Sequence, residues 1–357
     1  MPSGPDFKSK YRQLAEMIWL GLRYRFSPIE YRTYRFFFQN MKFPVMLTYL
    51  SNYELANKIR TKLYDNSVLP VLNNKLFFNL YYRAFGLSLP DFYAYYHPEH
   101  GFTADKELLR NEDDLRAWLA HKRLKQFFIK PCGGKKGTGV IAISDVQSSE
   151  NSNHLLTDTR GKTWSVEELC RQLHQGHGQS AFPGYVIEEK IEQDPFLSQI
   201  NPSSVNTCRI LTLALPDNTV AVLCAAFRFG RAGSPVDSWS QGGIAFSVDV
   251  STGMLKKGAF HPDWGSTDLV TNHPDSNIKL TGTIVPHWEE IKDLVRKAAS
   301  VTPGIKSIGW DVTISRKRPV LIEGNSYWSP LIFQGLDGGF LNNQFRNYFK
   351  QYKFNIR

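Results

Sequence analysis

Short apolar runs and segments of helical periodicity are mixed along this chain, without the strict alternation that a doubly wound parallel sheet requires. Apolar runs of strand length occur at residues 127–131, 140–144, 184–191, 207–215, 219–229 and 308–325. Helical spacing of apolar residues occurs at residues 73–86, 111–126, 165–176 and 287–300. This mixture of strands and helices predicts the α+β class.

The first 65 or so residues combine helical periodicity with many aromatic and basic side chains, as in YRQLAEMIWLGLRYRF. Tyr11, Leu14, Ile18 and Leu22 recur at helical spacing, which predicts a helix with one apolar face. We expect this face to pack on the rest of the protein. The alternative is contact with a membrane surface or a partner, because aromatic and basic groups together suit a lipid interface.

The composition is that of an ordinary globular protein: of 357 residues, 42% are hydrophobic and 21% are charged. This length allows two domains. The cysteines at 132, 170, 208 and 224 lie far apart and lack metal-ligand spacing, which argues against structural zinc and for reduced thiols. No segment approaches the roughly 20 apolar residues that span a bilayer. We therefore expect a cytoplasmic protein.

The chain is basic, with a formal net charge of +10. Such a protein attracts polyanions, including nucleotides, acidic sugars and anionic membrane surfaces. The sequence contains no zinc-finger spacing, RNP-type aromatic motif or basic heptads, so we do not expect a nucleic-acid partner. A solvated basic surface without a specific partner is the alternative.

The segment IGWDVTISRKRPVLIEGN predicts a hairpin whose apolar strands carry three oxygen-bearing side chains. If Ser315 pairs with Pro319, Asp311 faces Glu323 across the ladder, and Asn325 follows on the same face. Two carboxylates and an amide suit Mg²⁺, with phosphate oxygens completing its octahedral shell. A solvated polar sheet face is the alternative, and a register slip of one residue would separate the two carboxylates.

A loop of small residues follows the predicted strand that ends at Lys130, in FFIKPCGGKKGTGV. Around Gly134, Gly137 and Thr138 the backbone N–H groups can close over phosphate oxygens, because small side chains let the backbone approach. The loop matches neither the Walker A nor the GxGxxG pattern, and an ordinary hairpin is the alternative. Lys75 is a further candidate cation for phosphate.

Two other features indicate a nucleotide and substrate site. The predicted strand YVIEE ends in Glu188 and Glu189 and either lines a nucleotide pocket or is an ordinary strand end. Arg209, Arg228 and Arg231 lie on or directly after the next two predicted strands, where a half-buried arginine is costly unless it meets an anion. We expect these guanidinium groups to stabilise a phosphoryl group in transfer, and the glycine pair at 242–243 to offer backbone N–H groups to a substrate carboxylate.

Together, these parts resemble the ATP-grasp superfamily, which includes D-alanine–D-alanine ligase and biotin carboxylase. The segments SSVNTCRILTL, FRFGRAGSPVDSWSQGGIAFSVD and IGWDVTISRKRPVLIEGN are similar to those of the sugar-transfer-associated ATP-grasp proteins, and the resemblance covers roughly residues 70–335. It implies an ATP-grasp fold in which two α+β subdomains, residues 71–190 and 191–357, clamp ATP. Residues 1–70 form an atypical helical region in place of the usual N-terminal α/β domain.

The resemblance also implies a site for ATP and Mg²⁺. Phosphate and adenine contacts would come from Lys75, Lys130, Gly134, Gly137, Thr138, Glu188, Glu189 and Ile191, ribose contacts from Asp194 or Glu192, and metal ligands from Asp311, Glu323 and Asn325. Arg209 and Arg228 would act on the transferred phosphate, and the substrate would contact Asn206, Arg231, Asp237, Gly242 and Gly243.

The implied reaction is ATP-dependent ligation of a carboxylate to an amine through an acyl-phosphate. The family context implies an amino acid or amine joined to a sugar acid or other small acid, in polysaccharide or cell-surface biosynthesis, with a nucleotide sugar as a further candidate partner. One alternative is a kinase that phosphorylates a hydroxyl, with Asp237 or His261 as its base. The other is a non-catalytic nucleotide-binding scaffold at a glycan assembly, contacted through residues 1–65.

Overall fold

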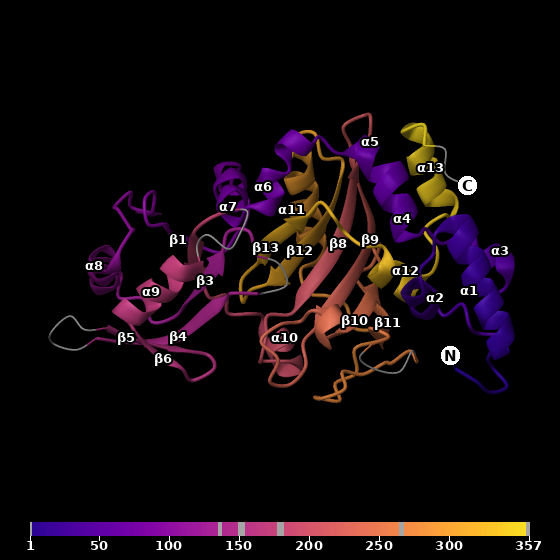
Figure 1. Ribbon diagram of the computed structural model, residues 1–357, viewed down its shortest axis with the longest axis horizontal. Coiled ribbons are helices and arrows are strands. Elements are labelled where there is room, and N and C mark those ends of the chain that lie inside the picture. The colour runs from indigo at the N-terminus through magenta and orange to yellow at the C-terminus, as the bar shows by residue number, and fades with distance from the viewer. Residues whose placement is uncertain (1, 135–137, 149–153, 177–181, 264–267, 355–357) are drawn as a thin grey trace. The chain divides into compact units, whose positions relative to one another are not determined.

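The computed structural model describes residues 2–134, 138–148, 154–176, 182–263 and 268–354, and these form two compact units (Figure 1). Unit 2 is the continuous segment Pro70–Glu192, and unit 1 combines Met1–Leu69 with Gln193–Arg357. The helical N-terminal region therefore belongs to the same compact unit as the C-terminal half of the chain. Each unit contains an antiparallel sheet with separate helices, so the predicted α+β class is confirmed.

Unit 2 is built on a seven-stranded sheet with the order β2-β1-β7-β3-β4-β5-β6. Its strands are β1 (Phe92–Tyr96), β2 (Phe102–Thr103), β3 (Phe127–Pro131), β4 (Ile141–Ser148), β5 (His154–Asp158), β6 (Thr163–Ser165) and β7 (Tyr185–Glu189), and its helices are α6 (Pro70–Asn73), α7 (Lys75–Ala84), α8 (Glu112–Lys122) and α9 (Val166–Gly176). The apolar face predicted for α8 is confirmed, because Leu115, Trp118 and Leu119 are buried in the core of this sheet.

Helix α7 begins and ends as its sequence predicts. The side-chain oxygen of Asn74 accepts the backbone N–H groups of Leu76 and Phe77, at 2.9 and 3.3 Å, which satisfies two donors at the helix start. Gly86 follows the end of the helix with φ at 66°, a conformation that glycine adopts without strain. Lys75 is therefore held at the first position of the helix.

Unit 1 is built on a six-stranded antiparallel sheet with the order β11-β10-β9-β8-β12-β13. Its strands are β8 (Thr207–Ala214), β9 (Val220–Phe229), β10 (Ile244–Val248), β11 (Leu255–Phe260), β12 (Ser307–Ile314) and β13 (Pro319–Asn325). The helices that follow residue 193 are α10 (Pro195–Ile200), η4 (Trp239–Gln241), α11 (Trp288–Ser300), α12 (Leu331–Asp337) and α13 (Asn343–Gln351). One core joins residues of β8 and β9 to α12, α13 and residues 50–63.

The β12–β13 hairpin brings Asp311 opposite Glu323, as the sequence predicts. The predicted pairing of Ser315 with Pro319 is wrong, because Pro319 pairs with Ile314, and the backbone N–H of Ser315 donates to the carbonyl of Arg318 at 2.9 Å. A bulge lies between the Asp311–Glu323 pair and the Val312–Leu321 pair. Ile322 is the extra residue on β13 there, and it moves the register by one position. The bulge therefore restores the pairing of the two carboxylates.

The N-terminal part of unit 1 contains α1 (Lys10–Tyr24), α2 (Pro28–Thr33), α3 (Phe43–Met46), α4 (Asn52–Glu54), the π-helical segment η1 (Leu55–Arg60), α5 (Thr61–Leu63) and η2 (Asn66–Val68). An aromatic core that includes Tyr31, Tyr34, Phe36 and Phe37 lies beneath α1 and is packed with Leu20. The expectation that the periodic face of α1 packs on the protein is wrong. Tyr11, Leu14, Ile18 and Leu22 are exposed, and the buried face of the helix carries Gln13 and Leu20 instead.

Within the described residues, no helix is long and apolar enough to cross a membrane.

Candidate functional site

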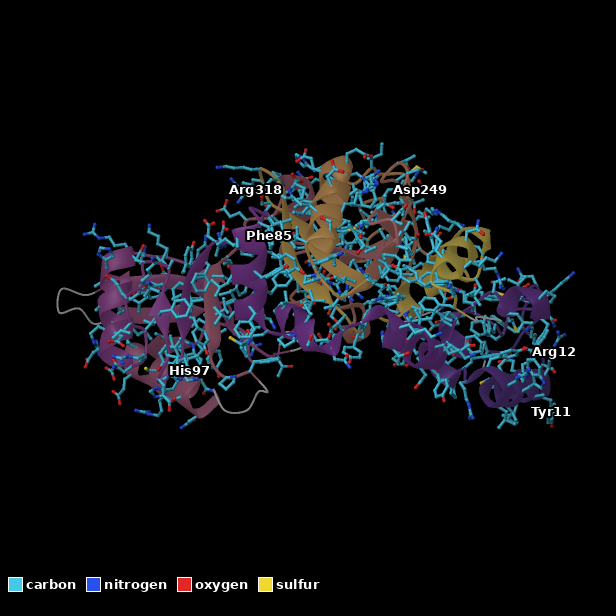
Figure 2. All side chains as sticks on the ribbon, turned by 90° about the horizontal axis from the view of Figure 1, so that it is seen from above. Tyr11, Arg12, Phe85, His97, Asp249 and Arg318 are labelled. Carbon is cyan, nitrogen blue, oxygen red and sulfur yellow. The ribbon has the colours of Figure 1, made fainter. Side chains whose placement is uncertain are left out.

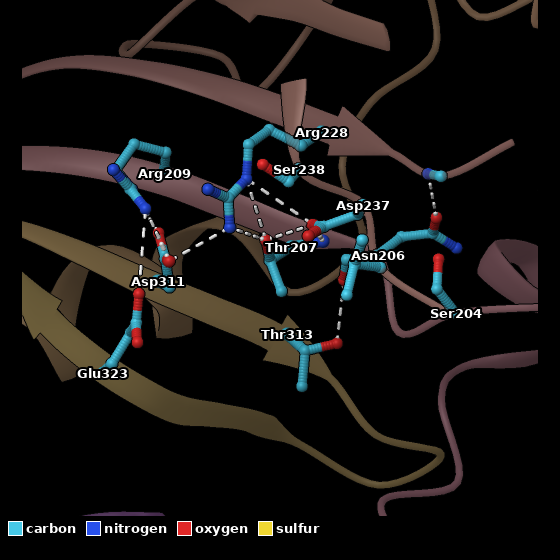
Figure 3. A network of polar contacts seen from close by, with 12 residues as sticks. Ser204, Asn206, Thr207, Arg209, Arg228, Asp237, Ser238, Asp311, Thr313 and Glu323 are labelled. Atoms are coloured by element: carbon cyan, nitrogen blue, oxygen red, sulfur yellow. Dashed lines mark hydrogen bonds and ion pairs between the residues drawn. The ribbon is translucent and has the colours of Figure 1, made fainter. Parts of the chain in front are cut away.

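A row of polar residues crosses four neighbouring strands of the unit 1 sheet. Arg209 on β8 lies directly opposite Asp311 on β12, and Asp311 lies directly opposite Glu323 on β13. Two residues along β8, Thr207 lies opposite Arg228 on β9. Because directly opposed residues of an antiparallel sheet point to the same face, this register gathers all five side chains on one surface (Figure 3).

Asp311 is the centre of this group. Its carboxylate accepts hydrogen bonds from both Nε and Nη2 of Arg209, the latter at 2.7 Å, and from Nη2 of Arg228 at 3.0 Å. The side chain of Asp311 is only 4% exposed. Burial by itself raises the pKa of Asp311, but the charges of Arg209 and Arg228 outweigh it and hold this pKa well below its usual range. The carboxylate is therefore ionised at neutral pH.

Arg228 is held by two further groups. Its Nε lies 3.1 Å from Oγ1 of Thr207 and 3.5 Å from a carboxylate oxygen of Asp237. Asp237 also accepts the backbone N–H of Thr207 at 2.9 Å and the Thr207 hydroxyl. Burial raises the pKa of Asp237, and the neighbouring Arg228 opposes that shift. Thr207 is the residue that sequence reasoning missed. The sequence feature that indicates Thr207 is its position two residues before Arg209, because alternate residues of a strand point to the same face.

The charges of this group do not balance. Arg209 and Arg228 supply two positive charges, whereas Asp237, Asp311 and Glu323 supply three carboxylates, so with all of them ionised the group carries a net charge of −1. Such a group disfavours an added anion unless a cation binds with it. Of the three predicted arginines, Arg209 and Arg228 form ion pairs with Asp311, whereas Arg231 forms one with Asp275.

Glu323 and Asn325 form the more accessible edge of the group. The Glu323 side chain is 41% exposed, lies 3.9 Å from Nη2 of Arg209, and accepts a 3.1 Å hydrogen bond from Asn325. Asp311 accepts three hydrogen bonds from Arg209 and Arg228, and its carboxylate also interacts with the side chain of Glu323. The carboxylates of Glu323 and Asp311 and the amide oxygen of Asn325 are hard oxygen donors of the kind that Mg²⁺ prefers when substrate oxygens complete its shell.

The set is too small to hold a metal by itself. Among the residues that the structure describes, no group of three or more His, Cys, Asp or Glu side chains is placed to hold a metal ion. A site of two carboxylates and one amide would depend on phosphate oxygens for its remaining ligands.

Arg231 and Asn206 are not brought to this surface as substrate contacts. Arg231 makes two hydrogen bonds to Asp275, at 2.8 and 2.7 Å, and these fix the loop after β9. Asn206 is fully buried. Its Nδ2 donates to Gln193 at 3.0 Å and its Oδ1 accepts the backbone N–H of Gly230 at 3.1 Å, so its amide joins loops of the fold.

The glycine pair after η4 has a packing role. The N–H of Gly243 donates to the carbonyl of Ser238 at 3.0 Å, so this group is engaged within the loop, and a substrate contact at residues 242–243 stays a prediction. A Cβ at Gly243 would lie 2.5 Å from the carbonyl oxygen of Asp237, so only glycine fits there. Gly242 has φ at 100°, which also favours glycine.

In unit 2, Lys130 on β3 and Glu188 on β7 form a largely buried ion pair on one face of the sheet. The Lys130 ammonium also lies 5.1 Å from the centre of the Phe128 ring. Lys75 donates from Nζ to the carbonyl of Gly134 at 2.6 Å, and its backbone N–H donates to the carbonyl of Cys132 at 2.9 Å. The two lysines predicted to contact phosphate are therefore anchored at the start of α7 and on β3, the strand that precedes the glycine loop.

The other predicted nucleotide contacts have different local settings. Gly137 lies outside the described residues, whereas Thr138 is exposed. Glu189 accepts the backbone N–H of Asp91 at 3.1 Å, and Ile191 is half-buried. Asp194 belongs to unit 1, where its carboxylate caps α10 by accepting the N–H of Phe196 at 2.8 Å. This cap gives Asp194 a structural role that the sequence did not indicate.

The model of one protein family matches most of this chain. The family is described as sugar-transfer associated ATP-grasp, and the match covers residues 54–348. The chain belongs to this family. The match includes the polar row of unit 1 and both lysines of unit 2, and it confirms the ATP-grasp fold that the sequence motifs predict. No curated protein matches the chain by sequence.

Similar solved structures of ATP-grasp enzymes are more distant. Biotin carboxylase from Campylobacter jejuni, in a β,γ-ATP complex, is 9% identical with a TM-score of 0.46, and the match covers 82% of this chain and 48% of that one. D-alanyl-alanine synthetase A from Vibrio cholerae is 9% identical with a TM-score of 0.45, covering 79% and 66%. L-amino acid ligase from Bacillus licheniformis is 14% identical with a TM-score of 0.41, covering 81% and 52%. This chain thus spans about half the length of the biotin carboxylase.

Proposed function

We propose that this ATP-grasp protein is an ATP-dependent carboxylate–amine ligase that forms an acyl-phosphate and releases ADP. The observation that supports it most directly is the Arg209–Asp311–Glu323 row, with Arg228 and Asn325 beside it. Glu323, Asn325 and Asp311 would hold Mg²⁺, which when bound neutralises charge on the phosphate oxygens of ATP. The family's description associates it with sugar transfer, and we propose on that basis that the acid is a sugar acid.

The reaction needs two bond exchanges. A substrate carboxylate oxygen bonds to the γ-phosphorus while the bond from that phosphorus to the β,γ-bridging oxygen breaks and ADP leaves. The amine nitrogen then bonds to the acyl carbon while the C–O bond to the phosphate breaks, and the amine loses one proton as phosphate departs. No protein side chain has to act as a nucleophile. The protein's task is to position the reactants and neutralise charge.

The residues of this chain contribute in distinct ways. Lys130 and Lys75 would bind the phosphates of ATP, and Glu188 would set the position of the Lys130 ammonium through their ion pair. Arg209 and Arg228 would face the negative charge of the transferred phosphoryl group and stabilise it in the transition state. Asp311 orients both guanidinium groups, because each donates hydrogen bonds to its carboxylate.

The test is nucleotide turnover with Mg²⁺ against a panel of uronic acids, nucleotide sugars and amino acids, with ADP and free phosphate measured separately. The proposal predicts that both products form in equal amounts, and only when an acid and an amine are present together. Release of ADP without phosphate would instead identify a kinase. ATP binding without any turnover across the panel would contradict the substrate class proposed here.

A further inference from the structure

The outward face of α1 is apolar along its whole length. Tyr11, Leu14, Ile18 and Leu22 are 88%, 46%, 54% and 73% exposed. Spacings of three and four residues place them in one stripe on the side of the helix opposite the buried Leu20. Figure 2 shows Tyr11 at the outer edge of unit 1. A stripe of large apolar side chains on the solvent side reverses the usual pattern of a surface helix.

Helix α3 extends this stripe into a wider surface. Trp19, 42% exposed, contacts Phe43 edge to face with ring centres 4.6 Å apart. Phe43 and Val45 are themselves 40% and 46% exposed. The α1–α3 apolar surface thus consists of Tyr11, Leu14, Ile18, Trp19, Leu22, Phe43 and Val45. Soluble monomers rarely expose so large a contiguous apolar patch without a function for it.

Basic side chains surround this surface. The exposed basic residues on or beside α1 and α3 are Lys10, Arg12, Arg23, Arg25 and Lys42. Lys10 and Arg23 lie on opposite flanks of the stripe and at opposite ends of the helix. Basic groups around an apolar helix face are the arrangement that anionic lipid attracts.

The acidic side chains of the same region are turned inward. Glu30 and Glu54 are 1% and 3% exposed, and Glu16 accepts hydrogen bonds from the buried Lys8 at 2.8 Å and from Tyr31 at 2.8 Å. Between residues 2 and 54, Asp6 is the one exposed acidic residue. Seen from outside, this part of unit 1 is therefore apolar and positively charged.

We propose that the α1–α3 apolar surface docks on an anionic lipid bilayer, with α1 lying in the plane of the interface. Leu14, Ile18 and Leu22 would enter the boundary between headgroups and acyl chains, and Tyr11 and Trp19 would lie at headgroup level. The flanking lysine and arginine side chains would contact lipid phosphates. The basic side chains around the surface complement anionic lipid in charge. They favour lipid over a protein partner, because the apolar stripe carries no charged group that could recognise a particular protein. The contact is peripheral, since α1 has only 15 residues.

The test is co-sedimentation of the full chain with vesicles of phosphatidylcholine that contain one part in three of phosphatidylglycerol, compared with pure phosphatidylcholine. We expect binding to the anionic vesicles that weakens at high salt, and much weaker binding to the neutral ones. The double variant Ile18→Asp, Leu22→Asp should bind at least about tenfold more weakly, because it removes two large apolar contacts. Lys10→Gln and Arg23→Gln should each weaken binding about fivefold.

The matched control is the double variant Leu269→Asp, Ile284→Asp. These residues are 44% and 62% exposed in another part of unit 1, and the control makes the same chemical change with the same change in net charge. It should bind the anionic vesicles as the wild type does. Unchanged thermal midpoints would show that both double variants fold.

Three outcomes would overturn the proposal. The first is a wild-type chain that does not bind the anionic vesicles. The second is equal binding by the two double variants, which would show that net charge alone drives association. The third is a stable dimer that the Ile18→Asp, Leu22→Asp variant dissociates, because a second copy of the chain would then cover this surface.

Discussion

Asp311 and Glu323 face each other across β12 and β13, at the one point where a bulge moves the register of the hairpin. If the ladder continued from the Val312–Leu321 pair without a bulge, Ile322 would lie opposite Asp311, and Glu323 would point to the other face of the sheet. In this sequence, the bulge is therefore what places the two carboxylates opposite each other on one face of the sheet. Bulges of this kind often aim side chains beside functional sites.

This relationship gives a first prediction. Deleting Ile322 should make the ladder regular and still leave Glu323 opposite Asp311, because Glu323 then follows Leu321 directly, so the folded variant should keep its turnover. Because a deletion in a strand also disturbs packing, the thermal midpoint has to be followed in parallel. A folded deletion variant without turnover would show that the pairing of these carboxylates is not sufficient and that the bulge itself is needed.

A second prediction compares two arginines. Arg228→Gln leaves Asp237 and Asp311 buried with one guanidinium fewer, and it should lower the free energy of unfolding by about 3 kcal/mol. Arg231→Gln removes an ion pair with Asp275 whose side chains are 39% and 23% exposed, and it should cost less than about 1 kcal/mol. Chemical denaturation of both variants measures the difference. Equal losses of stability in the two variants would contradict the inference that the buried Arg228 contributes more to stability than Arg231 does.

A third prediction concerns Lys130. Lys130→Met removes the cation proposed to contact phosphate, so the KM for ATP should rise at least about tenfold. The control is Lys125→Met, which changes an exposed lysine two residues before β3 and should leave KM unchanged. An unchanged KM in the Lys130 variant would show that this lysine serves only its ion pair with Glu188.

A fourth prediction concerns acid stability. His273 is fully buried, its Nε2 lies 2.9 Å from the carbonyl oxygen of Gly230, and burial lowers its pKa below the ordinary value of 6.5. Between the folded and unfolded pKa values the unfolded chain binds more protons, so stability rises with pH and is lost as pH falls below about 6.5.

The measurement for this prediction is the thermal midpoint of the wild type and of His273→Gln between about pH 7 and pH 5. The wild type should lose stability across this window. The variant should be less stable at neutral pH and change less with pH. Parallel curves for the two proteins would assign the acid sensitivity to other groups.

Much of the site was predictable because local patterns determine it. The hairpin itself follows from the two apolar runs around the basic turn, and the helix that starts at Lys75 follows from its Asn74 cap. The direct pairing of Asp311 with Glu323 depends on a bulge that regular alternation does not indicate. Long-range partners were not predictable. Nothing near Arg231 in sequence shows that Asp275 will bind it, and nothing near Asn206 shows that Gln193 and Gly230 will use its amide.

The N-terminal helix shows a different limit. Periodicity predicts correctly that Tyr11, Leu14, Ile18 and Leu22 share one face. It does not predict which face of the helix is buried. The opposite face is buried instead, where the side chain of Gln13 donates hydrogen bonds to the carbonyls of Lys8 and Pro2. The periodicity is the same whether the apolar stripe faces the core or the solvent, so it does not show which of the two faces is buried.

The most direct test of the ligase account follows a heavy-oxygen label placed in the carboxylate of an acid that turns over with its amine. If the carboxylate attacks the γ-phosphorus, one labelled oxygen leaves with each phosphate, and mass spectrometry of the released phosphate will find it there. The account predicts this transfer in the wild type and its loss, together with turnover, in Glu323→Gln. Phosphate without the label, or undiminished turnover in that variant, would contradict it.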